Sequence, residues 1–215
     1  MQFEVWVPKE ALKNMIFFTD SIRFREALLY ATQTHALQFR KGTNIPYVSH
    51  LYAVASLVME CGGDEDEVIA ALLHDAVEDQ GGMERLKEIQ QNFGDRVADV
   101  VCGCSEMYTK SKPPWRERKE RYIAHIKDPE TSSSVVLVSC ADKLHNARSI
   151  LSDYRIEGEK LWERFNASSE QILWFNRTLA NVFLERAKIP LAAELDRVVL
   201  DIERLVQERK TVSSP

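Results

Sequence analysis

AALLHDAVEDQGG, residues 70–82, is an apolar helical run that ends in a dense polar cluster. The cluster places four side chains that can bind a metal ion or move a proton within six positions: His74, Asp75, Glu78 and Asp79. If this segment is one continuous helix, all four side chains crowd one side of it. Three carboxylates in that arrangement repel one another, and a divalent cation or a bound proton would relieve the repulsion. The alternative is an ordinary solvated acidic helix end, closed by the two glycines.

The composition limits the class of protein. A length of 215 residues with 45% apolar residues is enough to bury a core in one domain or in two small ones. The 28 basic and 33 acidic residues leave a formal charge of 28 − 33 = −5, which argues against non-specific nucleic-acid binding. No apolar run reaches the roughly 20 residues that a membrane span needs. The start, MQFEVWVPKE, lacks the pattern of a signal peptide, so we expect a cytoplasmic protein.

The cysteines match neither a zinc ribbon nor a disulfide-rich scaffold. We therefore expect reduced and mostly buried thiols at Cys61, Cys102, Cys104 and Cys140.

Helical periodicity recurs along the chain. Asp20 or Ser21 can cap a helix whose apolar positions recur from Ile22 to Phe39. The segment of residues 47–63 predicts a second helix, and acidic residues 64–66 open the helix that carries the central cluster.

In the second half of the chain, Pro113 and Pro114 start a helix with Trp115 at its head. Residues 134–150, SVVLVSCADKLHNARSI, could begin as a buried strand, but the pattern continues without a breaker and favours one largely buried helix. The later aromatic residues are expected in the core: Trp162, Trp174, Phe175 and Phe183.

The sequence contains no internal repeat and no low-complexity linker. We therefore predict an all-α fold, with an N-terminal extension at residues 1–20 and a single domain at residues 21–210. Residues 1–18 form either an extra helix or a partner contact, and the sequence does not decide between them.

Three further sites carry candidate chemistry. Arg40 and Lys41 stand at a loop, where paired basic side chains suit phosphate, although a solvated basic helix end explains them equally well. His50 lies among apolar positions and should face inward, as a ligand or as a satisfied core histidine. Asp142 follows an apolar run, and Asn146 lies one turn later. A buried aspartate needs a metal ion, a cationic partner or several backbone donors, and Lys143 or Arg148 could be the cationic partner.

The segment of residues 110–128, KSKPPWRERKERYIAHIKD, is the most basic part of the chain. Some of its side chains could face a phosphorylated ligand, and a solvated charged face explains at least half of them.

Taken in order, His50, the pair His74 and Asp75, and Asp142 make a mixed nitrogen and oxygen set. Such a set suits an octahedral ion, such as manganese, iron or magnesium, with open positions for water.

These four residues resemble the metal-binding signature of the HD phosphohydrolase superfamily. Within it, the chain resembles the RelA/SpoT-type hydrolase domains and their stand-alone small alarmone hydrolases. The resemblance runs from about residue 21 to residue 190. Its most specific segments are RKGTNIPYVSH (residues 40–50), LLHDAVED (residues 72–79) and ADKLHNARS (residues 141–149).

The resemblance implies a single helical HD domain that removes the 3′-pyrophosphate from a guanosine or adenosine alarmone. It implies a divalent metal, manganese above the others, whose bound water attacks phosphorus. Glu78 and Asp79 would orient this water and move its proton. The implied substrate-binding residues are Arg40, Lys41, Tyr47, Lys143, Asn146 and Arg148.

The chain also departs from the family pattern. The loop after Lys41 is shorter than in the animal members. Trp115 stands where those members have a phosphate-facing lysine, so Lys112, Arg116 or Lys119 would have to substitute. A late-helix aromatic residue should contact the nucleoside, but the sequence does not single it out.

Two other readings stay open. An HD phosphohydrolase could act on another nucleotide, such as NADPH or a nucleoside monophosphate, although Arg40 and Lys41 favour a more highly charged substrate. An HD scaffold could instead bind a nucleotide or a protein partner without turnover, but such a scaffold has no need of Glu78 and Asp79. A homo-oligomer is compatible with the sequence, and we expect no nucleic-acid or membrane partner.

Overall fold

The computed structural model of the protein describes residues 20–106 and 113–212. In these ranges the fold is all-α, as predicted, and the only β-structure described is an isolated bridge between Phe39 and Pro46. The helices, in chain order, are α2 (Ile22–Thr34), α3 (Val48–Glu60), α4 (Glu65–Leu73), α5 (Ala76–Asp79), α6 (Gly82–Phe93), α7 (Asp95–Cys104), α8 (Trp115–Lys127), α9 (Ser133–Glu157), the 3-10 helix η2 (Gly158–Arg164), α10 (Ser169–Arg186) and α11 (Pro190–Val212). The predicted N-terminal extension falls almost wholly on residues 1–19, outside the described residues, and the domain boundaries stay a prediction.

Capping residues fix where several helices begin. The Ser21 side chain accepts a hydrogen bond from the Phe24 amide, which satisfies one of the unpaired N–H groups at the start of α2. Asp64 and Glu67 form a capping box at the start of α4, and Ser168 and Gln171 form another at α10. The polar residues between the apolar runs therefore set the helix boundaries.

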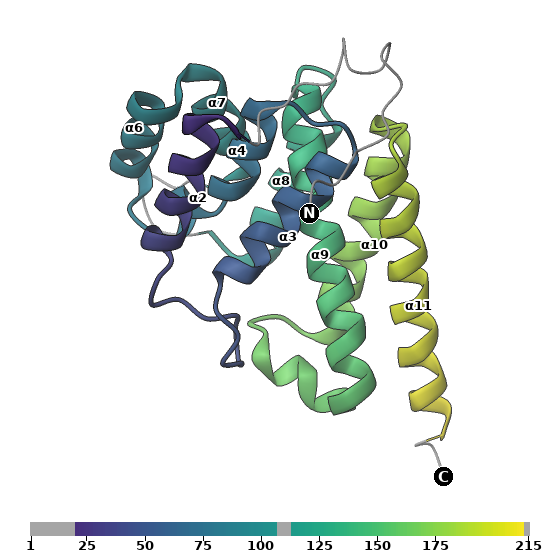
Figure 1. Cartoon of the computed structure of the whole chain (residues 1–215). Helices are drawn as coiled ribbons and strands as arrows, with labels where there is room; N and C mark the ends of the chain where they lie inside the picture. The colour runs from purple at the N-terminus through teal and green to yellow at the C-terminus, as the bar shows by residue number, and fades with distance from the viewer. Residues whose placement is uncertain (1–19, 107–112, 213–215) are drawn as a thin grey trace, which may run out of the picture.

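Helix α9 is the central element (Figure 1). The predicted single helix is confirmed and spans 25 residues. Helices α3, α4 and α7 pack against it, as do α10 and α11. Val138, Leu144 and Ala147 of α9 are fully buried, and burial of such apolar surface stabilises the fold by roughly 25 cal/mol per Å². Because α9 touches most of the fold, its polar positions are held rigidly.

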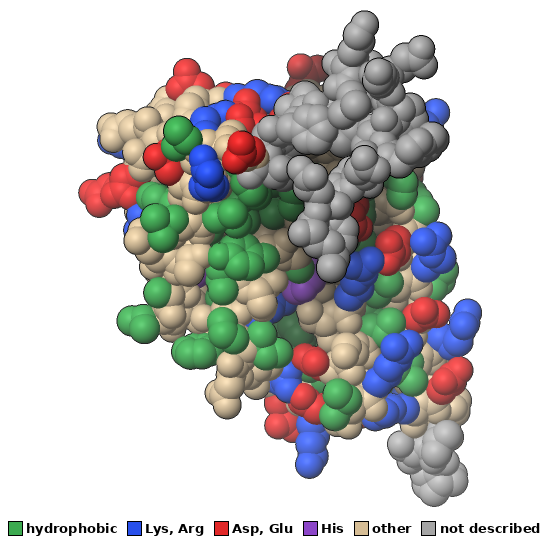
Figure 2. All heavy atoms as spheres, viewed as in Figure 1, with side chains coloured by type: hydrophobic (Ala, Val, Ile, Leu, Met, Phe, Trp, Pro, Cys, Tyr) green, Lys and Arg blue, Asp and Glu red, His purple; other side chains and the backbone are tan. Residues whose placement is uncertain are grey.

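Apolar side chains also gather on one side of the surface. Figure 2 shows them over the part of this face where α2 and α3 lie, while charged side chains of both signs cover the part over α9 and α11. The exposed large hydrophobic residues of α2 and α3 are Ile22, Leu29 and Tyr52. Among the described helices, none is long and apolar enough to cross a membrane.

The first predicted helix is shorter than expected. The sequence pattern ran from Ile22 to Phe39, but α2 ends at Thr34 and the chain turns at residues 35–37. The reason is the loop that follows, which closes on itself through backbone hydrogen bonds from Tyr47 to Gln38 (2.9 Å) and from Arg40 to Ile45 (2.8 Å). Phe39 pairs in this loop and cannot remain helical.

The predicted continuous helix through the central cluster is also wrong. Helix α4 ends at Leu73, and a turn at His74 and Asp75 separates it from the short helix α5. This turn directs His74 and Asp75 toward α9, whereas Glu78 and Asp79 lie on the exposed side of α5. The four groups therefore divide into an inner and an outer pair.

The cysteines are free thiols, as expected. The expectation that they are mostly buried is wrong, because only Cys140 is buried and Cys61, Cys102 and Cys104 are partly exposed. Cys61 follows the last residue of α3, and Cys102 and Cys104 lie in the last turn of α7, so all three are at helix ends.

Candidate metal centre

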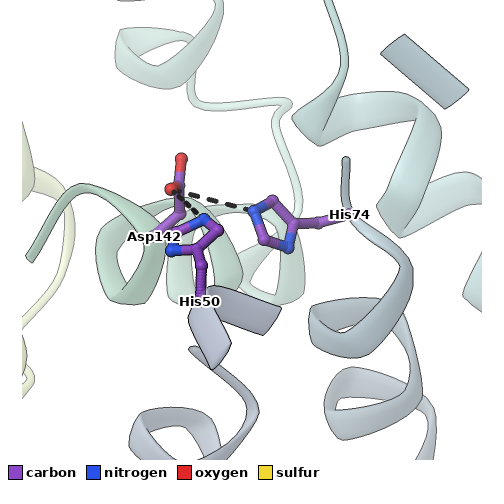
Figure 3. A group of neighbouring side chains, drawn as sticks. All are labelled: His50, His74 and Asp142. Carbon is purple, nitrogen blue, oxygen red and sulfur yellow. Dashed lines mark ion pairs between the residues drawn. The ribbon is translucent and has the colours of Figure 1, made fainter. Parts of the chain in front are cut away.

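Three separate elements bring the inner residues together. His50 projects from α3, His74 follows α4, and Asp142 projects from α9 (Figure 3). The three residues are 0%, 3% and 6% exposed, and each offers one ligand atom within 4.8 Å of the others. His50 faces inward, as the apolar pattern around it predicted.

The two imidazoles face two carboxylates. Asp142 Oδ1 lies 3.2 Å from His50 Nε2 and 3.7 Å from His74 Nε2. Asp75 Oδ2 lies 3.4 Å and 3.0 Å from the same two nitrogens. The structure thus brings together all four residues of the predicted ligand set.

Neither His50 Nε2 nor His74 Nε2 makes a hydrogen bond within the described parts of the chain, although both are buried. A buried polar atom that lacks a hydrogen bond is costly, and two such nitrogens that face the same two carboxylates are explained by a shared cation. Imidazole nitrogens and carboxylate oxygens are suitable ligands for a divalent metal. The residues present therefore fit a divalent metal ion.

Hydrogen bonds at the other ring nitrogens orient the two histidines. His74 Nδ1 donates to the backbone oxygen of Ala71 at 2.7 Å, so Nε2 is the nitrogen that faces the carboxylates and can bind a metal ion. His50 Nδ1 lies 2.7 Å from Nδ1 of His145. The sequence analysis missed His145, although its position three residues after Asp142 on a buried helix placed it near the same site.

The carboxylates have partners too. Tyr47 donates a hydrogen bond to Asp75 Oδ2 at 2.6 Å. Lys143 donates to Asp142 Oδ2 at 2.5 Å, and Asn146 donates to Asp142 Oδ1. Burial opposes the charge on both aspartates, but His74 holds the pKa of Asp75 well below its usual value and Lys143 does the same for Asp142. Both carboxylates are therefore ionised at neutral pH, as metal ligands must be.

A cavity of about 610 Å³ adjoins the centre. Arg40, Lys41, Tyr47, Asn146 and Arg148, all predicted as substrate-binding residues, line it, and its apolar lining includes Leu161 and Phe165. This volume is within the range of roughly 300–1,000 Å³ found for small-molecule sites. Phe165 is an aromatic residue of this lining but follows η2 rather than lying on a helix, so the prediction of a late-helix aromatic contact stays a prediction.

Contacts inside the protein hold the basic side chains of the cavity in place. Arg40 donates to Asn146 Oδ1 at 2.7 Å, so the guanidinium is linked through one amide to Asp142. Lys41 donates to Asn166 at 3.3 Å, and Arg148 forms an ion pair with Glu194 of α11.

Lys143 differs from the other predicted substrate-binding residues because it does not line this cavity. It lies on the far side of Asp142, with its ammonium group 5.0 Å from the centre of the Tyr122 ring. Burial lowers the pKa of Lys119, and the nearby positive charge of Lys143 lowers it further. Lys119 is paired with Glu106 at 2.5 Å. A second group of cations therefore approaches the centre from α8 and α9.

Among the other candidates from the basic segment, the guanidinium of Arg116 lies 3.2 Å from the centre of the Trp174 ring. Trp115 packs edge-on against Trp174 and Phe175, as part of an apolar cluster rather than as a cavity wall. Lys112 lies outside the described residues.

The outer acidic pair lies at the end of α5. Glu78 accepts a hydrogen bond from the Glu106 amide at 3.4 Å. Asp79 Oδ2 accepts one from Gln38 Nε2 at 2.7 Å. Partial burial and the charge of Asp75 raise the pKa of Asp79, which moves it toward the range of a proton acceptor. Gln38 was not singled out from the sequence, because an isolated glutamine has no distinctive pattern.

Comparison with known proteins identifies the family of this chain. The HD domain family model matches residues 27–171. The chain is 31% identical over 182 residues to the guanosine-3′,5′-bis(diphosphate) 3′-pyrophosphohydrolase MESH1 of Drosophila melanogaster. The alignment covers 83% of this chain and 93% of MESH1. It is 30% identical over 151 residues to the bifunctional (p)ppGpp synthase/hydrolase SpoT of Escherichia coli, covering 68% of this chain.

The bacterial relatives are much longer proteins. The chain spans 19% of SpoT and 16% of a probable GTP pyrophosphokinase of Mycobacterium leprae, with which it shares 34% identity over 59% of its own length. Among solved structures, a metazoan SpoT orthologue that hydrolyses ppGpp superposes with a TM-score of 0.65 at 26% identity, covering 88% of this chain and 96% of that one. A protein of Listeria monocytogenes superposes with a TM-score of 0.62 at 30% identity, over 74% and 99% of the two chains.

Proposed function

Because this chain belongs to the HD domain family, we propose that it hydrolyses the 3′-pyrophosphate of guanosine or adenosine alarmones, (p)ppGpp or (p)ppApp, and releases pyrophosphate. The observation that carries the proposal is the convergence of two unsatisfied imidazole nitrogens and two ionised carboxylates beside a cavity with basic walls. The relatives whose printed names describe this reaction support it.

In this proposal His50, His74, Asp75 and Asp142 hold a divalent ion, with Mn²⁺ as the preferred one. Two imidazoles with two carboxylates suit an octahedral ion that keeps positions for water. When bound, the ion lowers the pKa of a coordinated water and polarises the phosphoryl oxygen. The hydrogen bond from His74 Nδ1 to Ala71 keeps that ring aimed at the ion.

Glu78 and Asp79 handle the proton of the attacking water. Both lie on α5, which begins directly after the turn that carries His74 and Asp75, so they stand next to the ligand set without belonging to it. The raised pKa of Asp79, caused by burial and by Asp75, suits the role of proton acceptor. Glu78 then orients the water.

The cavity holds the nucleotide. Arg40, Lys41 and Arg148 supply positive charge along its wall, and a nucleotide with two diphosphate groups needs more of it than a monophosphate does. Tyr47 and Asn146 place polar groups between the cavity and the ion. Lys143, which pairs with Oδ2 of Asp142, would bind a phosphate group of the substrate beside the ion.

The test is a hydrolysis assay of the purified chain with Mn²⁺ and a panel of ppGpp, pppGpp, ppApp, NADPH and AMP. We expect pyrophosphate from the first three and none from NADPH or AMP. Release of phosphate without pyrophosphate would instead indicate a different phosphohydrolase. No turnover on the whole panel, with Mn²⁺ bound, would indicate a binding protein. The same assay without metal is the control.

A further inference from the structure

Gln38 connects the loop of residues 35–47 to the outer acidic pair. Its Nε2 donates to Asp79 Oδ2 at 2.7 Å. Its Oε1 accepts from Gln80 Nε2 at 2.8 Å and lies 2.7 Å from His35 Nδ1. One amide side chain therefore contacts Asp79 on one side and two nitrogen atoms on the other.

This arrangement is satisfied in one orientation of the amide only. A carboxylate accepts hydrogen bonds, so the NH₂ group of Gln38 has to face Asp79. The oxygen then faces Gln80 Nε2 and His35 Nδ1, and both can donate to it. A rotation by half a turn would set the Gln38 oxygen against the Asp79 carboxylate and its NH₂ group against that of Gln80, and would lose both of these bonds; only the contact with His35 could persist, through the other tautomer of the ring.

The support behind Gln38 is rigid. The His35 residue is 2% exposed, and its ring stacks on that of Tyr47 with centroids 5.3 Å apart and an angle of 17°. Both backbone polar groups of Gln38 are hydrogen-bonded. The Gln38 amide donates to the backbone oxygen of His35 at 3.0 Å, and the Gln38 backbone oxygen accepts from the Tyr47 amide at 2.9 Å. Gln38 thus stands on the base of the loop that also carries Arg40 and Lys41.

Asp79, by contrast, lies at the end of a helix of four residues and is exposed to solvent on one side. A side chain there can adopt several rotamers unless another group selects one. A carboxylate that must accept a proton in a defined direction gains from such a selection, because small displacements of a reacting group reduce the rate strongly.

We propose that Gln38 is a positioning residue for Asp79: its amide engages Oδ2, and this leaves Oδ1 to take the proton of the attacking water. His35 holds the amide of Gln38 in the orientation that this requires. The inference rests on the proposed function. In the step concerned, one O–H bond of the water breaks and its proton passes to Asp79, while the water oxygen forms a bond to the phosphorus that carries the 3′-oxygen. The bond between this phosphorus and the 3′-oxygen breaks, the 3′-oxygen takes up a proton and stays on the nucleotide as a hydroxyl group, and the released pyrophosphate contains the water oxygen.

The experiment compares Gln38→Met with wild type, since methionine has a similar length and no amide. We expect kcat for ppGpp to fall about 10- to 100-fold, with KM, the Mn²⁺ affinity measured by calorimetry, and the melting temperature near wild type. His35→Phe keeps a ring against Tyr47 and removes the bond to Gln38, so it should lower kcat in the same way but less. Gln33→Met, on the exposed side of α2, is the matched control and should leave every quantity unchanged.

The outcomes separate the two proposals. A wild type that releases no pyrophosphate overturns the proposed function and this inference with it. An active wild type whose kcat is unchanged in Gln38→Met overturns the inference alone. A Gln38→Met protein that loses Mn²⁺, or in which only KM rises, also overturns it, because Gln38 would then act on the metal or on the substrate instead of on Asp79.

Discussion

His50 and His145 share a hydrogen bond between their two Nδ1 atoms, which lie 2.7 Å apart. One of the two rings must donate the proton. Burial and the neighbouring His50 lower the pKa of His145 to about 4, so His145 is neutral at physiological pH and can accept through Nδ1. His50 then carries its proton on Nδ1 and presents the Nε2 lone pair to the site. The orientation of His50, one of the proposed ligands, therefore depends on a residue of α9 outside the proposed ligand set.

The first prediction concerns this bond. His145→Leu removes the acceptor and should weaken Mn²⁺ binding by about 10- to 100-fold, because the partners of ligand histidines fix the tautomer and the ring direction. Isothermal titration of the metal-free protein with Mn²⁺ measures the effect. Ser149→Ala, one turn later on α9 and also on the cavity wall, is the control. Equal affinities in His145→Leu and Ser149→Ala would show that the bond has no influence on the metal.

The second prediction separates the ligands from the rest of the site. His74→Ala removes one of the two unsatisfied buried nitrogens and should leave the protein without stoichiometric Mn²⁺. Metal content after dialysis, measured by atomic emission, tests this directly. If the variant keeps full occupancy, His74 is not a ligand and the assignment of the centre fails.

A third prediction concerns the outer pair. Asp79→Asn keeps the size of the side chain but cannot accept a proton, so turnover should fall by at least about 100-fold. Metal content and melting temperature should stay close to wild type, since Asp79 lies outside the ligand set. Loss of metal together with activity would place Asp79 among the ligands instead.

Much of the fold was predictable from local patterns. The run from Val135 to Ile150 kept helical spacing without a breaker, and α9 confirms that single helix. His50 was predicted to face inward because its neighbours are apolar. These features depend on residues that are close in sequence, where periodicity and capping are strong signals.

The parts that failed depend on contacts between distant segments. Nothing in LLHDAVED indicates that the helix breaks at His74, since the turn gains its stability from Asp142 and Tyr47 on other elements. The partners of the site were missed for the same reason. His145 and Gln38 have ordinary local surroundings, and only the packing of α9 and of the loop before α3 brings His145 to His50 and Gln38 to Asp79.

The fourth prediction is a pH dependence away from the metal ligands. Glu106 is partly buried and forms ion pairs with Arg118 and Lys119; burial opposes its charge, but the two cations lower the pKa of Glu106 below its usual value. A carboxyl group with a lowered folded-state pKa stabilises the fold above its unfolded pKa of about 4.3, and this contribution disappears as the pH falls through the folded value. Urea unfolding should therefore show wild type more stable than Glu106→Gln at pH 7. The difference should shrink below about pH 4.3, and a constant difference would contradict the ion pair as its cause.

The last prediction tests the packing of α7 on α9. A Cβ atom added at Gly103 would lie 2.5 Å from Cγ2 of Val135, so the two helices touch where only a hydrogen atom fits. In Gly103→Ala, the better helix propensity of alanine should stabilise the fold by about 1 kcal/mol. Overpacking against Val135 should cost about 1–3 kcal/mol, so the net effect should be destabilising. We expect a lower free energy of unfolding by urea. Val135→Ala removes the obstructing methyl groups, so the same Gly103→Ala change made in that background should cost less or become stabilising. Equal costs in both backgrounds would show that the close approach to Val135 is not what requires glycine here.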